Sequence, residues 1–291
     1  MYICFKLKRA IACILIAAAL AAILPIGSML TSAHTDEAEK GIFLPAIMYH
    51  SICGDEPQEY ICTPEQADND LKWLYDNGYK TVSAEQLIDY THGKGELPDK
   101  PVLITLDDGF YNNLSELLPL LEKYDMCAVV SIVGRYTDDY APADPHCPRY
   151  SYLTWEDISE LIASGRVEIG NHTYDMHTVN GRRNGCSKNY GEDNEQYSEA
   201  LNADISVLQT ELIQNTGYEP VVFAYPFGIV SRESLPVLRE NGILMTLTCR
   251  EAPNHITRDP DSLYGINRYN RSGYYSTEEF MARITNDSQS Q

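Results

Sequence analysis

The stretch PVLITLDDG, residues 101–109, joins a nearly continuous apolar run to two carboxylates and a glycine. A run that is apolar at successive positions predicts a strand buried on both faces, as in a parallel sheet covered by helices. Asp107 and Asp108 would then follow the carboxyl end of this strand. The doublet is the first sign that a reactive edge of the sheet lies here.

Similar apolar runs recur along the chain, and most are followed by a pattern typical of a helix. Ser83, with Gln86 three residues later, has the order of a capping box and predicts a helix over 83–91. Some seven or eight such units predict an α/β fold, a distorted (β/α) barrel with seven or eight strands. The further strands are expected in FLPAIMY (43–49), residues 79–82, CAVVSIV (127–133), VEIG (167–170), PVVFAYP (220–226), ILMTLTC (243–249) and residues 264–267.

The amino-terminal segment has the pattern of an export signal. Lys6, Lys8 and Arg9 precede the apolar run 10–24, and a stretch of mostly small residues ends at Ala33. Residues 1–33 are therefore expected to be a cleaved signal peptide or a retained membrane anchor, and both alternatives stay open. Residues 34–40 would be a linker, and residues 41–291 a catalytic domain that is extracellular or attached to the cell surface.

The net charge and the cysteines narrow the possibilities further. A formal net charge of −20 argues against a nucleic-acid partner, because phosphate binding needs clustered basic residues. Two of the eight cysteines lie in the amino-terminal segment, and the remaining six allow up to three disulfides. Cys53 and Cys62 are the first candidate pair. Cys127 and Cys249 lie in apolar runs and are more readily explained as buried thiols.

Titratable residues follow several of the expected strands. His50 ends the first, Asp107 and Asp108 end the second, and His172 and His177 follow VEIG. The carboxyl ends of barrel strands meet at one rim, so these side chains are expected together. One carboxylate and two imidazoles form a common three-ligand set for a catalytic divalent metal.

Each of these features has a simpler explanation when it stands alone. A DDG doublet is often only a turn, and His50 could be a core residue. His172 and His177 are five positions apart, so they do not share a helical face and must converge from a loop. Their joint occurrence at strand ends favours a metal site.

ITLDDGF, EIGNHTYDMH and FAYPFG resemble the first three motifs of the polysaccharide deacetylase family, a carbohydrate esterase group with the NodB homology domain. The resemblance extends over about residues 41–285. It implies that Asp107 is the catalytic base and that Asp108, His172 and His177 bind one divalent ion, usually Zn²⁺. It also implies hydrolysis of the N-acetyl group of a glycan, with a backbone N–H near Phe227 holding the oxyanion and Tyr225 near the substrate.

The departures from the family pattern point to one branch. The histidine spacing of five and the sequence Met48-Tyr49-His50 are similar to the poly-N-acetylglucosamine deacetylase branch, which implies that His50 is the general acid. Ala224 replaces the usual third-motif arginine, and Arg268 is the hypothetical substitute that would orient the base. A late histidine of the LxH type is missing, and Cys249-Arg250 stands at that point.

Two other functions are open alternatives. The missing arginine and late histidine would suit a weak or inactive carbohydrate-binding protein on the same fold. A glycoside hydrolase is disfavoured, because its two carboxylates must lie about 5–10 Å apart and flank the sugar. Peptidoglycan, poly-N-acetylglucosamine and chitin-like oligomers all carry the acetamide group. Several aromatic residues could stack on sugars or belong to the core: Tyr174, Tyr225, Phe227 and Tyr269.

Overall fold

The computed structural model describes residues 41–143, 145–179 and 183–286. The expected signal peptide or anchor, residues 1–33, and the linker, residues 34–40, lie outside these residues, so their assignment stays a prediction. Among the helices that are described, none is both long enough and apolar enough to cross a membrane.

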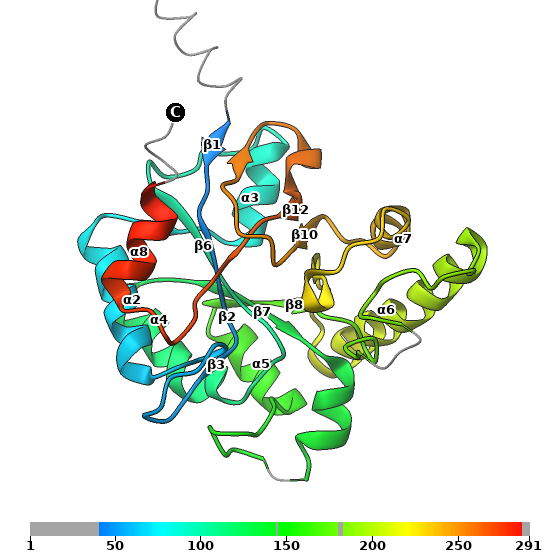
Figure 1. The fold of residues 1–291 in the computed structure, drawn as a ribbon, viewed down its shortest axis with the longest axis horizontal. Coiled ribbons are helices and arrows are strands. Elements are labelled where there is room, and N and C mark those ends of the chain that lie inside the picture. Colours follow the sequence, from blue (N-terminus) through cyan, green and yellow to red (C-terminus); the bar gives the residue numbers. More distant parts are fainter. Residues whose placement is uncertain (1–40, 144, 180–182, 287–291) are drawn as a thin grey trace, which may run out of the picture. The chain divides into compact units, whose positions relative to one another are not determined.

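A parallel sheet of nine strands forms the centre of the fold (Figure 1). Its main path runs β12-β10-β9-β8-β7-β6-β2-β13, and β5 pairs with the beginning of β6. Eight of the strands match the apolar runs expected from the sequence, and β13, two residues long, is the addition. The bounds are β2 (Ala46–Tyr49), β5 (Lys80–Thr81), β6 (Pro101–Leu106), β7 (Ala128–Ile132), β8 (Val167–Asn171), β9 (Val222–Ala224), β10 (Met245–Leu247), β12 (Tyr264–Ile266) and β13 (Tyr269–Asn270).

The two ends of this path are joined by a very short connection. β12 and β13 lie at opposite ends of the strand order, yet only Asn267 and Arg268 separate them in the chain. The sheet must therefore curl until its ends meet. Arg268 N donates to Arg250 O at 3.0 Å, on one side of this seam, and Arg271 N donates to Met48 O at 2.9 Å on the other. The predicted distorted barrel is confirmed, with an irregular closure at Arg268.

Helices surround the sheet on its outer side (Figure 1). Four of them begin with a capping box. In this motif the side chain of the N-cap residue accepts a hydrogen bond from the backbone N–H three residues later, and the side chain of that later residue accepts one from the N-cap backbone N–H. The box predicted for Ser83 and Gln86 is among them. The helices are α2 (Pro64–Asp76), α3 (Ala84–Thr91), α4 (Leu118–Tyr124), α5 (Trp155–Ala163), α6 (Asn194–Thr216), α7 (Ser234–Glu240) and α8 (Thr277–Asn286), with shorter turns η1 (Asn113–Leu117), η2 (Tyr136–Tyr140), η3 (Pro226–Gly228) and η4 (Pro260–Leu263).

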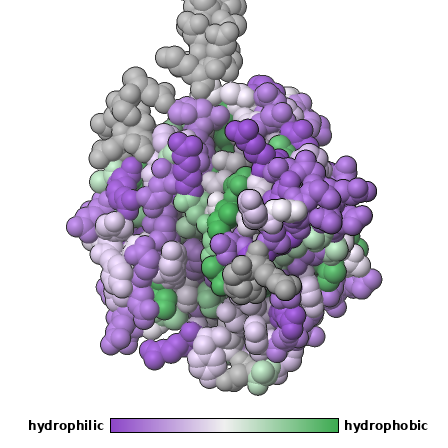
Figure 2. All heavy atoms as spheres, turned by 45° about the vertical axis from the view of Figure 1, so that its right-hand side comes forward, coloured by the Kyte–Doolittle hydropathy of each residue, from purple (hydrophilic) through white to green (hydrophobic). Residues whose placement is uncertain are grey.

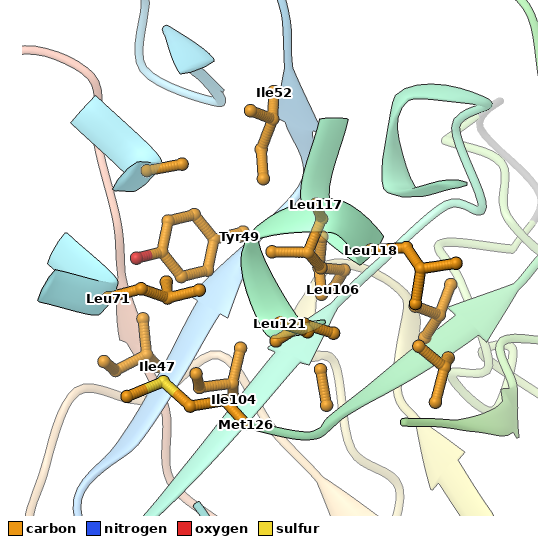
Figure 3. Close-up of a cluster of buried hydrophobic side chains, with 14 of the residues drawn as sticks. Ile47, Tyr49, Ile52, Leu71, Ile104, Leu106, Leu117, Leu118, Leu121 and Met126 are labelled. Carbon is orange, nitrogen blue, oxygen red and sulfur yellow. The ribbon is translucent and has the colours of Figure 1, made fainter. Parts of the chain in front are cut away.

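A large hydrophobic core lies between the strands and the helices (Figure 3). Ile104 and Leu106 of β6 point outward into it, together with Ile47 and Tyr49 of β2. Because side chains alternate along a strand, Thr105 and then Asp107 point to the inside of the barrel. The pattern that builds the core thus also directs the first carboxylate of the doublet inward.

Several short strands beside the main sheet were not expected from the sequence. The expected strand 43–49 is divided into β1 (Ile42–Phe43) and β2, and β3 (Ser51–Ile52), β4 (Ile61–Cys62) and β11 (His255–Ile256) lie outside the main sheet. The candidate pair Cys53 and Cys62 forms no disulfide, because all six described cysteines are free. Cys53 Sγ lies 3.3 Å from Ser51 Oγ, whereas Cys62 Sγ donates to Arg271 O at 3.2 Å.

The surface is in keeping with the strongly acidic composition. Figure 2 shows a face on which hydrophilic residues predominate, with a smaller group of hydrophobic residues near its centre. Most large apolar side chains of the described residues are buried in the core instead.

Candidate metal and catalytic centre

Asp107 and Arg268 form a buried ion pair inside the barrel. Asp107 Oδ1 accepts a hydrogen bond from Arg268 Nη1, and Oδ2 accepts one from Nη2, each at 2.7 Å. The side chains are 2% and 0% exposed. Burial by itself would raise the pKa of Asp107, but the charge and hydrogen bonds of Arg268, together with His172 and His50, outweigh it and hold this pKa well below its usual range. Asp107 is therefore ionised at every working pH.

A left-handed turn directs Asp108 to the same site. Asp108 has φ of 72° and Gly109 has φ of 73°, which is uncommon for a non-glycine residue. A Cβ at Gly109 would lie 3.0 Å from Ile132 Cγ2, so this position has little room for a side chain. The turn interrupts the strand alternation that would otherwise send Asp108 to the outer face. Two adjacent carboxylates can thus serve one site.

His172 follows β8 and is held in one orientation by the neighbouring strands. Its backbone N–H donates to Ile132 O at 2.9 Å, and its Nδ1 lies 2.8 Å from Ala224 O. A carbonyl oxygen can only accept, so Nδ1 carries the hydrogen and Nε2 keeps a free lone pair. The ring is 2% exposed. Its Nε2 lies 3.7 Å from Asp108 Oδ1.

His177 approaches the same carboxylate oxygen from the loop that follows. Its Nε2 lies 3.3 Å from Asp108 Oδ1, and its Nδ1 lies 3.2 Å from the hydroxyl of Tyr136. The rings of His172 and His177 have centroids 4.8 Å apart. Tyr136, which the sequence analysis did not single out, thus contacts the ring nitrogen of His177 that faces away from Asp108. Metal-binding histidines usually have such a hydrogen-bond partner on their second ring nitrogen.

These three side chains fit a divalent metal ion. Their ligand atoms lie within 4.8 Å of one another, and the buried Asp108 Oδ1 has no hydrogen-bond partner among the described residues. Burial lowers the pKa of His172 to about 3 and also lowers that of His177, so both are neutral, as ligands must be. Burial, together with the charge of Asp107, raises the pKa of Asp108 to about 7. A cation at this point would offset the repulsion between the two carboxylates.

His50 lies in the same cavity as Asp107. It follows β2, and its Nδ1 is buried without a hydrogen-bond partner among the described residues. Its ring meets Tyr60 edge-on, with centroids 4.8 Å apart. Burial lowers the pKa of His50 to about 4, although the charge of Asp107 opposes this. The imidazole is therefore neutral near pH 7.

The turn after β9 brings one of its two expected residues into the cavity. Phe227 has φ of 58°, is 44% exposed, and its ring lies 4.5 Å from that of His177. Its amide belongs to the first turn of η3, where backbone N–H groups have no acceptor within the helix. Tyr225 is 2% exposed and its hydroxyl lies 2.7 Å from Ser234 Oγ. The structure does not bring the side chain of Tyr225 to the cavity wall.

The cavity has a volume of about 760 Å³ and includes residues that the sequence pattern did not single out. Tyr60 and Tyr274 are 55% and 67% exposed at its wall. Cys249, where a late histidine was missing, also lines it, with Sγ 3.8 Å from Arg268 Nη2. Tyr60 and Tyr274 come from loops without a motif, so only the fold reveals their position. Cys249, expected as a buried thiol, is only partly buried.

Comparison with known proteins identifies the family. The model of the polysaccharide deacetylase family matches residues 94–246, just over half of the chain. The chain belongs to the polysaccharide deacetylase family. This match contains Asp107, Asp108, His172 and His177, whereas His50 and Arg268 lie outside it.

Three relatives of this chain agree with the assignment. The protein YxkH of Bacillus subtilis, provisionally named a polysaccharide deacetylase, is 28% identical over 248 residues, which cover 85% of this chain and 78% of that protein. Poly-β-1,6-N-acetyl-D-glucosamine N-deacetylase of Escherichia coli is 27% identical over 196 residues, 60% of this chain and 29% of the longer relative. A de-N-acetylase structure from Aggregatibacter actinomycetemcomitans superposes with a TM-score of 0.69 at 25% identity, covering 84% of this chain and 99% of the other.

The ion pair between Asp107 and Arg268 compensates for the arginine that is missing from the third family motif of this chain. Ala224 stands where the third motif usually has an arginine, and its carbonyl oxygen accepts the hydrogen bond of His172 Nδ1. Arg268 contacts the carboxylate of Asp107 from the barrel seam instead. The missing motif arginine therefore does not leave Asp107 without a cationic partner, and this argument for an inactive binding protein no longer holds.

Proposed function

We propose that this chain is a metal-dependent N-deacetylase that hydrolyses the acetamide of an N-acetylated polysaccharide and releases acetate. The observation that carries the proposal is the arrangement of Asp107 beside the Asp108, His172 and His177 donor set in one open cavity. A protein that only binds glycans has no need for an ionised carboxylate next to three metal donors. We assign Zn²⁺ as the preferred ion, because two imidazoles and one carboxylate suit it.

The reaction divides between the residues of the site. A bound divalent ion would polarise the acetamide carbonyl and lower the pKa of water. Asp107 accepts the proton of the attacking water as a new C–O bond forms at the carbonyl carbon. The amide N–H of Phe227 stabilises the oxyanion, and His50 donates a proton to the amine as the C–N bond breaks. The products are acetate and a glycan with a free amine.

The proton that His50 donates must be acquired during the reaction. His50 is neutral near pH 7, because burial lowers its pKa to about 4. Asp107 is a weak proton holder, since Arg268 keeps its pKa below the usual range. A proton taken up by Asp107 therefore passes readily to a better base, and the unpartnered imidazole of His50 lines the same cavity.

The substrate that we propose is a polymer of N-acetylglucosamine. The cavity volume lies in the upper part of the range of about 300–1,000 Å³ that is usual for ligand sites. Tyr60, Phe227 and Tyr274 offer exposed aromatic surface there, which can pack against sugar rings. The Escherichia coli relative is named for poly-β-1,6-N-acetyl-D-glucosamine, which makes this polymer the first candidate.

The site of action that we propose is outside the cell. The basic and apolar pattern of residues 1–33 supports export, either as a secreted protein or as one anchored at the cell surface. Polymers of N-acetylglucosamine are met in that compartment. Detection of the intact chain or of a cleaved form in the culture medium and membrane fractions tests this assignment.

Acetate release from defined glycans tests the function. Oligomers of poly-β-1,6-N-acetylglucosamine, peptidoglycan fragments and chitin oligomers are each incubated with the protein, with and without a chelator. We expect release from the first, loss of release with the chelator, and recovery on addition of Zn²⁺. Binding of these glycans without any release of acetate, in the presence of Zn²⁺, would overturn the proposal in favour of the carbohydrate-binding alternative.

A further inference from the structure

The loop that connects His172 to His177 has five backbone groups of three consecutive residues, 173–175, in hydrogen bonds to neighbouring segments. Thr173 N donates to Asn171 Oδ1 at 2.8 Å, and the amides of Tyr174 and Asp175 donate to the two carboxylate oxygens of Asp204 at 2.8 and 2.9 Å. On the other side, Thr173 O accepts from Gly134 N at 3.1 Å and Tyr174 O from Arg135 N at 2.9 Å. The path of the loop is thus determined by its neighbours.

The loop needs this external support because its conformation is not a regular one. Thr173 has φ of 75° and is fully buried, although the left-handed region is unfavourable for a β-branched residue. Two histidines four residues apart could share the face of a helix, whose own hydrogen bonds would hold them. The spacing of five in this chain excludes that solution. An acceptor from elsewhere must therefore satisfy the amides between the two ligands.

Asp204 supplies this acceptor from the middle of α6. A carboxylate that accepts two successive amides fixes the direction of the peptide planes between the ligands. The same helix also holds the end of β8, because Asn171 Nδ2 donates to Ile205 O and to Gln209 Oε1, each at 3.2 Å. The strand end and the loop are consequently attached to one rigid element.

We propose that Asp204 is the positioning residue that sets the separation and direction of His172 and His177 for metal binding. The proposal rests on the metal site of the proposed function and adds a residue that touches neither the ion nor the substrate. Residues behind metal ligands typically change metal affinity by about 10–100-fold when they are replaced. Burial raises the pKa of Asp204 to about 6, so tests are made at pH 8, where it is ionised.

Zn²⁺ affinity of Asp204→Asn, measured by competition with a chromophoric chelator at pH 8, tests the proposal. An asparagine can accept from only one of the two amides, so we expect affinity to fall by about 10–100-fold. Glu168→Gln is the matched control. Glu168 likewise accepts two successive amides, those of Ala84 and Glu85 at 2.5 and 3.0 Å, but they belong to the start of α3. This control should bind Zn²⁺ as the wild type does.

A second variant covers the case in which Asp204→Asn does not fold. Asp204→Glu keeps the carboxylate but moves it by one methylene, and the absorption spectrum of its Co²⁺ complex should differ from that of the wild type. Wild-type Zn²⁺ affinity and an unchanged Co²⁺ spectrum in the Asp204 variants would overturn the proposal and leave the proposed function intact. Zn²⁺ binding by the wild type without acetate release would overturn the function and leave the role of Asp204 intact.

Discussion

Arg268 donates two hydrogen bonds of 2.7 Å to the two oxygens of Asp107, although the two residues lie 161 positions apart in the chain. The pair connects the barrel seam to the end of β6 and at the same time orients the carboxylate that faces the metal donors. A bidentate guanidinium determines both the position and the angle of its partner, which a single ammonium group cannot do. The stability of the barrel and the orientation of the Asp107 carboxylate therefore depend on the same contact.

Replacement of Arg268 by lysine should reduce turnover beyond its effect on stability. The variant keeps the charge but loses the double contact, so we expect a stability loss of about 2 kcal/mol and a fall in kcat of roughly 10²-fold. Arg271→Lys is the matched control, because Arg271 forms a similar buried pair with Asp70, two residues that do not line the cavity. Urea denaturation and acetate release separate the two effects. Equal losses of kcat in both variants would contradict an orienting role.

Separate replacement of each carboxylate of the doublet should distinguish the catalytic role of Asp107 from the metal-binding role of Asp108. In Asp107→Asn we expect kcat to fall by roughly 10²–10⁴-fold, the usual contribution of a general base, while bound Zn²⁺ stays near one per chain. In Asp108→Asn and His177→Ala the metal content itself should fall. Metal analysis of the purified variants checks this. Retained hydrolysis by Asp107→Asn argues against its role as base, and unchanged metal in His177→Ala argues against its role as ligand.

Glu211 should make the folded protein less stable as the pH rises. Burial raises the pKa of Glu211 to about 7 from its ordinary value of about 4.5, and the charge of Asp138 adds to this. Below pH 4.5 the group is protonated in both the folded and the unfolded state. Above pH 7 it is charged in both, and the folded state bears the cost of a partly buried charge. Glu211→Gln should therefore gain thermal stability over the wild type between about pH 4.5 and 7.

The Tm of both proteins across this range, measured without added metal, checks the effect. Glu199→Gln, which replaces an exposed glutamate of the same helix, serves as control. Its difference from the wild type should stay nearly constant over the same interval. A Glu211→Gln curve parallel to that of the wild type would show that the wild-type side chain loses its proton in the ordinary range.

Removal of the Tyr274 ring should weaken glycan binding without slowing the chemical step. Tyr274 is 67% exposed at the cavity and does not contact the metal donors. For Tyr274→Ala we expect KM to rise by about 3–10-fold, in line with the contribution of one aromatic contact, and kcat to change little. Tyr75→Ala is the control, because Tyr75 is 54% exposed on α2 and does not line the cavity. A decrease in kcat with constant KM would indicate a different role for Tyr274.

Much of the barrel could be read from local patterns. Runs such as PVLITL are apolar at successive positions because helices cover the parallel sheet from outside, and Ser83 and Gln86 mark a helix start through a local exchange of hydrogen bonds. Asp107, Asp108, His172 and His177 were foreseeable as one cluster, since parallel strands end at one rim. β13 was missed because Tyr269 and Asn270 lie in a polar stretch without an apolar run.

Contacts between distant segments required the three-dimensional structure. Nothing in the order of residues states that Asp204 accepts the amides of the metal loop, that Tyr225 turns into a core, or that the thiols of Cys53 and Cys62 face different partners. Local sequence specifies strand ends, because hydrophobic periodicity and capping act over a few residues. The direction of each side chain at the site depends on how the sheet curls and closes, and that is decided by packing across the whole barrel.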